Sequence, residues 1–206
     1  MDDLLVSYRY ALRMPNAQES LSVFKEKLFT HHAFKILEGK EQLLISPIFK
    51  KGSVELIQPI FDFDGRKSSG VLKAYDEAQE LTNKLNKYPF IYELTKDGVH
   101  VAFNIALYDI QDVKMFRTAI KKITASYSTL DIPATFKDLP IFRFGSYREN
   151  YTMSPVRDLN MKSFSEIVNK KPLDLYDRDM WLKLWKQFLF PKHTVSATSF
   201  LKRLSS

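Results

Sequence analysis

The stretch VELIQPIFDFDG, residues 54–65, joins a run of branched and aromatic residues to two acidic residues. Such a run, closed by a glycine, predicts a buried strand. Side chains two positions apart in a strand point to the same face, so Asp62 and Asp64 project together. Phe61 and Phe63 point into the core behind them. The stretch therefore predicts a core strand that carries a pair of carboxylates on its other face.

Helices and further strands are predicted on both sides of this strand. The expected elements are strand-like pieces within 4–12, a helix at 18–30, a polar loop at 66–70, a helix at 71–87, strands at 90–95 and 99–107, a helix at 112–126, strands at 130–134 and 141–147, and a helix at 177–189. Beyond Pro191 the residues are polar and predict a loose tail. The order strand, helix, hairpin, helix, strands predicts an α+β fold with helices packed on a mixed β-sheet.

The dipeptide Asp97-Gly98 is typical of a two-residue hairpin turn between the strands at 90–95 and 99–107. In that register Thr95 lies opposite His100, and the apolar residues of both strands share one face. His100 then lies on the other face, beside small or polar residues. That arrangement leaves room for a ligand at the imidazole, although an exposed histidine on a half-buried sheet is the simpler alternative.

Composition limits the kinds of site the chain can build. Lys and Arg number 31 against 24 Asp and Glu, which gives a formal net charge of +7 and favours contact with polyanions, unless the protein is simply basic. There is no cysteine, and the four histidines are too few and too scattered for a zinc ribbon. We therefore expect no zinc, and any metal to be held by oxygen, as Mg²⁺ and Mn²⁺ prefer.

Hydropathy predicts a protein without a membrane partner. No apolar run reaches the roughly 18 residues of a membrane-spanning helix. Asp2 and Asp3 are acidic where a signal peptide would be basic. We therefore expect a cytoplasmic, intracellular protein.

Three short segments stand in a particular order. They are Asp62-Phe63-Asp64, Gly98-Val99-His100 and Leu130-Asp131, the last followed twelve residues later by Arg143-Phe144-Gly145-Ser146. Together they resemble the three motifs of the archaeo-eukaryotic primase superfamily over residues 54–147. The resemblance implies a primase-polymerase catalytic core with an element like the RNA-recognition motif (RRM). Without cysteine for the zinc-binding insertion of cellular subunits, the chain is most similar to compact primases of plasmid or viral type.

The resemblance also implies roles for individual residues. In that family the two acids of the first motif and the aspartate of the third bind two catalytic Mg²⁺ or Mn²⁺ ions, here through Asp62, Asp64 and Asp131. The histidine of the second motif, here His100, contacts the phosphates of the incoming nucleotide, and Arg143 holds the triphosphate. Further nucleotide contacts are expected from Ser146, Lys96 and Arg148, and contacts to DNA from Arg66 and Lys67.

The chain departs from the family pattern in two places. Thr95-Lys96 stands where many members have serine and arginine, and we expect Lys96 to supply the positive charge. Tyr147-Arg148-Glu149 stands where many members have a histidine after the Gly-Ser pair. We expect Arg148 to make the phosphate contact instead.

The function implied by the resemblance is template-directed nucleotidyl transfer. A primase or primase-polymerase would make primers on single-stranded DNA from nucleoside triphosphates. A repair-type DNA polymerase of the same superfamily, a metal-dependent nuclease and a non-catalytic single-stranded nucleic-acid-binding domain are the alternatives. Residues 1–173 would form the catalytic domain, and residues 174–206 a C-terminal helical segment and tail. A chain this short has little room for a separate initiation domain or a helicase. We therefore expect either that the helical C-terminus assists priming, or that the chain is a fragment of, or partner to, something larger, such as a helicase or an accessory primase subunit.

Overall fold

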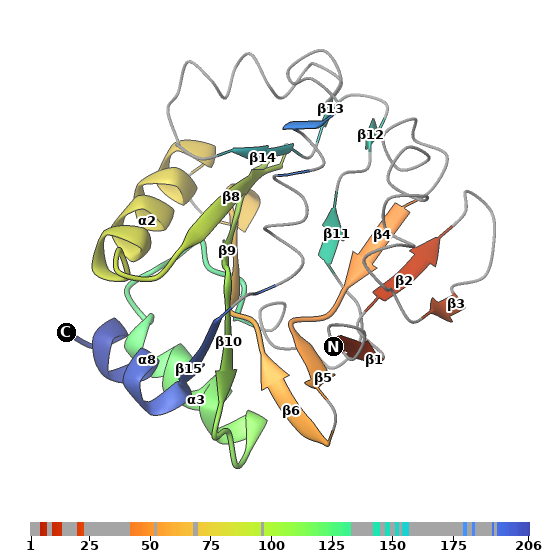
Figure 1. Ribbon diagram of the computed structural model, residues 1–206. Helices are drawn as coiled ribbons and strands as arrows, with labels where there is room; N and C mark the ends of the chain where they lie inside the picture. The colour runs from red at the N-terminus through yellow and green to blue at the C-terminus, as the bar shows by residue number, and fades with distance from the viewer. Residues whose placement is uncertain are drawn as a thin grey trace.

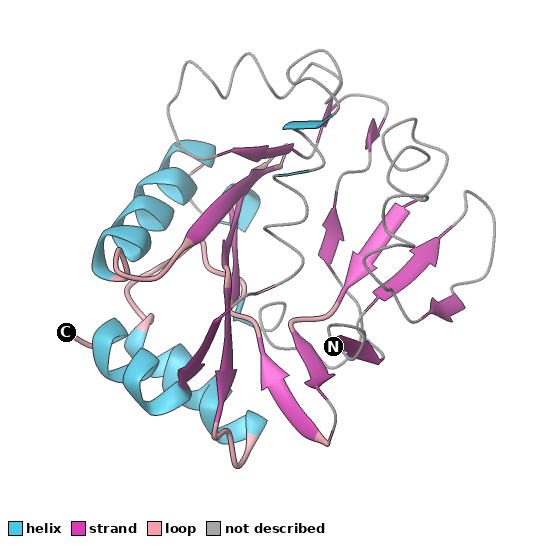
Figure 2. Ribbon diagram, in the orientation of Figure 1, coloured by secondary structure: helices cyan, strands magenta, loops and turns pink. Residues whose placement is uncertain are grey.

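The fold is seen in a computed structural model, in which helices and strands are combined as the predicted α+β class requires (Figure 1). The structure describes residues 5–7, 10–13, 20–22, 42–51, 53–67, 70–95, 97–132, 142–144, 147–148, 151–152, 154–156, 179–180, 183, 191 and 193–206. Three helices of this part of the chain, at the left of Figure 2, pack on one side of the strands.

The central sheet is built around the stretch that carries the acidic pair. Its strands, in spatial order, are β14 (Ser154–Val156), β8 (Phe90–Leu94), β9 (Gly98–Phe103) and β7 (Ile60–Asp64). β9 is antiparallel to both β8 and β7. On the free side of β7, Leu130 forms an isolated antiparallel bridge with Phe63. β7 is therefore enclosed between β9 and the segment around Leu130.

The connections in this sheet form two interlocking units. β7 and β8 are parallel, because both are antiparallel to β9, and helix α2 (Val71–Lys84) joins them. After β9 the chain passes through helix α3 (Val113–Ile123) to the Leu130 segment, on the far side of β7. The order is that of a split β-α-β-β-α-β arrangement. Both predicted long helices are confirmed; Asp112 caps α3 by accepting hydrogen bonds from the Lys114 and Met115 backbone.

A second sheet continues below the first in Figure 1. Its strands, in spatial order, are β1 (Leu5–Ser7), β5 (Ile48–Lys51), β6 (Val54–Ile57), β10 (Ile105–Tyr108) and β15 (His193–Ser196). The predicted strands at 54–64 and 99–107 are therefore wrong as single elements, since each one breaks between the two sheets. The first breaks at Gln58 and Pro59, because proline has no N–H to pair, and the second breaks at Asn104.

The N-terminal predictions need correction. A third sheet has the order β11 (Phe142–Phe144), β4 (Gln42–Ile45), β2 (Tyr10–Arg13) and β3 (Ser20–Ser22), and β12 (Tyr147–Arg148) pairs with β13 (Tyr151–Thr152). Residues 4–12 contribute to two strands in different sheets. The predicted helix at 18–30 is wrong at residues 20–22, where pairing with β2 outweighs local helical spacing. Residues 23–30 lie outside the described part.

The loose tail predicted after Pro191 is wrong. β15 pairs in parallel with β10, and helix α8 (Ala197–Leu204) follows it, with the Ser196 hydroxyl accepting from the Ser199 backbone. Phe200 is fully buried, and its ring lies 5.8 Å from that of Phe103. The apolar side chains of α8 thus complete the core between the sheet and the helices. Of the helix predicted at 177–189, only residues 179, 180 and 183 are described, all helical.

The hairpin between β8 and β9 has a different register from the predicted one. Glu93, rather than Thr95, lies opposite His100. Across the turn, the Thr95 backbone N–H donates to the Gly98 carbonyl at 3.0 Å. The pairing is displaced by two residues, and because side chains alternate with a period of two, His100 keeps its predicted face.

Gly98 belongs to strand β9 because β9 and β7 approach closely there. A Cβ atom at this position would lie 1.9 Å from the carbonyl oxygen of Phe63. Backbone cannot move aside as a flexible side chain can, so only glycine fits. The glycine of the Asp97-Gly98 dipeptide thus serves the contact between strands rather than the turn.

We expect Gly98→Ala to destabilise the fold by about 3 kcal/mol or more, the upper range for overpacking a well-packed site. The added methyl group would force β9 away from β7 and disturb the pairing of Asp62 with His100. Urea denaturation followed by circular dichroism measures the change. A variant as stable as the wild type would contradict the close approach of the two strands.

Candidate functional site

A row of ionisable side chains crosses the central sheet on the face turned away from the helices. Asp62 on β7 pairs with His100 on β9, and His100 pairs with Glu93 on β8. Directly opposite residues of antiparallel strands place their side chains on the same face. We call Glu93, His100 and Asp62 the charged row. The row stands next to an apolar one, in which Ile60, Ala102 and Ile91 occupy the same three strands.

Asp131 extends the charged row on the free side of β7. Its backbone N–H donates to the Asp62 carbonyl at 2.7 Å, and the Asp64 N–H donates to the Thr129 carbonyl at 2.8 Å. These bonds flank the bridge between Phe63 and Leu130 and put Asp131 opposite Asp62. Asp62, Asp64 and Asp131 therefore share one face of the sheet.

His100 is buried between two carboxylates. Its Nδ1 lies 2.7 Å from Glu93 Oε2, and its Nε2 lies 3.5 Å from Asp62 Oδ1. Burial lowers the pKa of the imidazole, but the charges and hydrogen bonds of Asp62 and Glu93 outweigh burial and raise that pKa to about 10. His100 is therefore an imidazolium at neutral pH. The charged row thus holds the imidazole ring of His100 between two carboxyl groups.

Asp64 faces the loop after β7 instead of the charged row. Both of its carboxylate oxygens accept from the Arg66 guanidinium, at 2.7 to 3.2 Å, and Oδ1 also accepts from the Arg66 backbone. The Arg66 side chain is 70% exposed, whereas that of Asp64 is 12% exposed. Arg66 also lies 3.6 Å from Asp97. An exposed arginine thus neutralises the second acid of the pair in a bidentate contact.

The structure brings together only part of the predicted site. Asp62, Asp64, Asp131 and His100 share one face, and Arg66 joins them through Asp64. The backbone of Arg143 pairs with Leu44 in the third sheet, and Arg148 lies in β12. Their side chains, and that of Lys67, lie outside the described part. Lys96 and Ser146 lie wholly outside it.

Sequence reasoning missed Glu93, which the structure places at the end of the charged row. Its side chain is fully buried and holds His100 in place. The sequence contains one signal that could have found it. Glu93 interrupts the strand FIYEL, in which every other residue is apolar or aromatic, and a buried acid requires a partner. The two-residue error in register concealed which partner it has.

The three aspartates of the site have the kind of ligand atoms that a divalent metal ion requires. Asp62, Asp64 and Asp131 offer hard oxygen ligands on one face, the kind that Mg²⁺ and Mn²⁺ take. In the conformation described, Asp64 points to Arg66 and Asp62 to His100. Within the described residues, no three acidic or histidine side chains form a ready metal cluster. Binding an ion would require Asp64 to exchange Arg66 for the metal.

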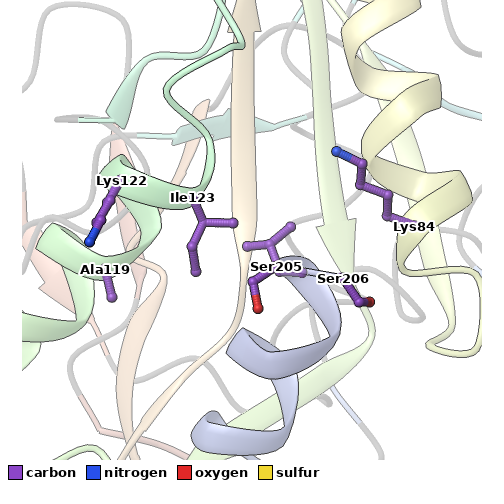
Figure 3. Close-up of a pocket in the computed structure, with 7 residues that line it drawn as sticks. Lys84, Ala119, Lys122, Ile123, Ser205 and Ser206 are labelled. Atoms are coloured by element: carbon purple, nitrogen blue, oxygen red, sulfur yellow. The ribbon is translucent and has the colours of Figure 1, made fainter.

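A pocket of about 470 Å³ lies elsewhere, between the C-terminal ends of three helices (Figure 3). It is lined by Lys84, Ala119, Lys122, Ile123, Leu204, Ser205 and Ser206. The amines of Lys84 and Lys122 do not converge in Figure 3, and Lys84 pairs with Glu80 at 2.9 Å. We assign no ligand to this pocket.

Comparisons with known proteins found no relative of this chain. Neither a protein-family model, nor a curated protein, nor a solved structure matches the chain. Of the helices in the described part, none is long and apolar enough to cross a lipid bilayer.

The charged row predicts a pH dependence of stability in the metal-free protein. The pKa of His100 rises from 6.5 to about 10 on folding, so the stabilising contribution of the imidazolium is complete below pH 6.5 and is lost as the pH rises through 10. We expect the stability difference between wild type and His100→Gln to shrink over that interval, in urea denaturation with a chelator present.

Glu93→Gln tests whether the Glu93 carboxylate helps to raise the pKa of His100. Removing this carboxylate should lower the pKa of His100, which imidazole resonances in a nuclear magnetic resonance titration report directly. If His100 titrates near pH 6.5 in the wild type, the imidazolium assignment is wrong.

Proposed function

We propose that the chain is a template-directed nucleotidyltransferase, a primase or primase-polymerase that joins nucleotides on single-stranded DNA. The observation that carries the proposal is the shared face of Asp62, Asp64, Asp131 and His100 at one side of β7. These residues come from three separate parts of the sequence, in the order of the motifs they resemble. The split β-α-β-β-α-β order of the central sheet agrees with the RRM-like element expected of such a core.

Asp62, Asp64 and Asp131 would hold the divalent ions. When bound, two Mg²⁺ or Mn²⁺ ions would neutralise the triphosphate and lower the pKa of the attacking 3′-hydroxyl. The three aspartates repel one another, and Arg66 beside Asp64 offsets part of that repulsion. The 24% exposure of the Asp62 side chain leaves it reachable from solvent.

His100 would hold a phosphate group of the incoming nucleotide. Its imidazolium is oriented by Glu93, which accepts from Nδ1 and so directs Nε2 toward Asp62, the most exposed member of the row. A phosphate oxygen brought beside Asp62 would accept from the same Nε2–H. Arg143, Ser146, Arg148 and Lys96 remain proposed further contacts to the nucleotide.

Arg66 and Lys67 would contact the template backbone. Arg66 is the better supported, because a metal at Asp64 would release its guanidinium into a position next to the reacting groups. Contacts to phosphate would make DNA binding weaken steeply with salt.

The face of the sheet argues against a purely nucleic-acid-binding module. Such modules stack bases on exposed aromatic side chains of the sheet. In the charged row and its apolar neighbour, no aromatic side chain occupies that face of β7, β8 or β9. The aromatic side chains Phe61, Phe63 and Phe103 lie in the core under the helices.

We expect the wild-type protein to incorporate labelled nucleotides on single-stranded DNA in the presence of Mn²⁺. Asp62→Asn should lower that activity by at least about a thousandfold, because the variant loses a carboxylate that would hold the catalytic metal ions. Gel electrophoresis of reactions with and without a primer measures the products. Asp76→Asn, an exposed acid on α2, is the matched control and should remain active.

The pattern of products separates the alternatives. Products formed only with a primer would replace priming with the repair-type polymerase reaction. Degradation of the template alone would favour a nuclease. Nucleic-acid binding with neither reaction, and no effect of Asp62→Asn on Mn²⁺ binding, would leave a non-catalytic binding domain.

Arg66→Ala should tighten the binding of Mn²⁺ in the absence of nucleotide, because the arginine no longer competes for the Asp64 oxygens. An exposed ion pair contributes about 0.2 to 1 kcal/mol, so the expected gain in affinity is at most about fivefold. Calorimetry measures it, with Lys114→Ala on α3 as a control that removes the same charge elsewhere. Equal or weaker binding by Arg66→Ala would show that the two cations do not compete at Asp64.

A further inference from the structure

Helix α2 carries one acidic residue that is buried against another segment of the chain. Glu77 is 6% exposed, although Asp76 and Glu80 on the same helix are exposed. Its side chain reaches the backbone at residues 128–129, about fifty positions further along the sequence.

Both oxygens of the Glu77 carboxylate accept two hydrogen bonds each. Oε1 accepts from the Ser128 backbone N–H at 2.9 Å and from the Ser128 hydroxyl at 3.1 Å. Oε2 accepts from the Thr129 backbone N–H at 2.9 Å and from the Thr129 hydroxyl. Burial raises the pKa of Glu77, but these bonds more than offset it and hold the pKa below its ordinary value. Glu77 is therefore a carboxylate with its acceptor positions in use.

The segment that Glu77 holds is the one that carries Asp131. The Thr129 carbonyl accepts from Asp64, and the Asp131 N–H donates to Asp62. Residues 128–131 are thus hydrogen-bonded to Glu77 of α2 at one end and to the backbone of β7 at the other. The bridge to β7 has only these two backbone hydrogen bonds, so the four hydrogen bonds to Glu77 add substantially to what holds the segment beside β7.

We infer that Glu77 is a positioning residue for the metal site: it fixes the turn at 128–129 and so places the Asp131 carboxylate beside Asp62. The inference rests on the proposed function for the role of Asp131. Glu77 itself would touch neither metal nor nucleotide. It acts as the outer partners of metal ligands do, by setting the place and orientation of a residue that binds.

Glu77→Gln is the first test. The amide keeps the size of the side chain but offers a single oxygen, so one of the two backbone N–H groups loses its acceptor. We expect the affinity for Mn²⁺ in the presence of dATP to fall by about tenfold or more, the usual effect of removing a group that orients a metal ligand. Asp76→Asn, at the neighbouring exposed acid on α2, removes the same charge and should bind as the wild type does.

A double-mutant cycle with Asp131→Ala separates positioning from general loss of structure. If Glu77 acts through Asp131, Glu77→Gln has no further effect on Mn²⁺ affinity once Asp131 is alanine. Calorimetry gives the affinities, and thermal unfolding without metal shows that each variant is folded. Additive losses of affinity in the double variant would overturn the inference and indicate a purely structural role.

If Glu77→Gln does not fold, the milder variant Thr129→Val can test the same inference. Thr129→Val removes one hydroxyl donor to Glu77 and keeps the backbone N–H, so it should weaken Mn²⁺ binding to a smaller degree, again only while Asp131 is present. Failure of the wild type to bind Mn²⁺ with dATP, or an Asp131→Ala protein that binds normally, would contradict the proposed function. Normal binding by Thr129→Val and Glu77→Gln, with weakened binding by Asp131→Ala, would contradict only the role of Glu77.

Discussion

The pairing of a buried imidazolium with two carboxylates is the constraint on which the central sheet depends. Taking charges out of water is expensive, and His100 is tolerated at 6% exposure because Glu93 and Asp62 flank it. The three residues come from three strands, so they meet only in one register. A shift of β9 by one residue would turn His100 into the apolar core and leave Glu93 buried without its partner. The contact between Gly98 and Phe63, the break at Pro59 and the bridge at Leu130 are consistent with that single register.

Local patterns were sufficient to predict the elements that surround this row. Alternation along β7 identified which side chains face the core, and helical spacing identified α2 and α3, because each pattern is contained within one element. The face of His100 was also predicted, although its partner was wrong. An error of two residues in register leaves side chains on the same faces and changes only the opposite residue, so the prediction could place His100 without finding Glu93.

The remaining features depend on contacts that no local pattern contains. Ser20–Ser22 forms a strand because it pairs with β2. The C-terminal residues form β15 and α8 because they pair with β10 and pack Phe200 against Phe103. Glu77 looks like any polar residue of an amphipathic helix until the turn at 128–129 is brought against it. Residues that orient a site from a distant element are therefore the ones that sequence reasoning is least able to find.

The cost of the charged row is itself an argument that the row has a purpose. A buried ion cluster contributes little to stability, and well-packed apolar residues in its place are often as stable or more so. Apolar residues of this kind occupy the neighbouring row, where Ile60, Ala102 and Ile91 lie side by side on the same strands. Moving along β7 toward its C-terminal end, the face therefore changes from apolar to charged within two residues and reaches Asp64 two residues later. Stability alone does not require that change, whereas the proposed site for metal ions and phosphates beside Asp62 would require it.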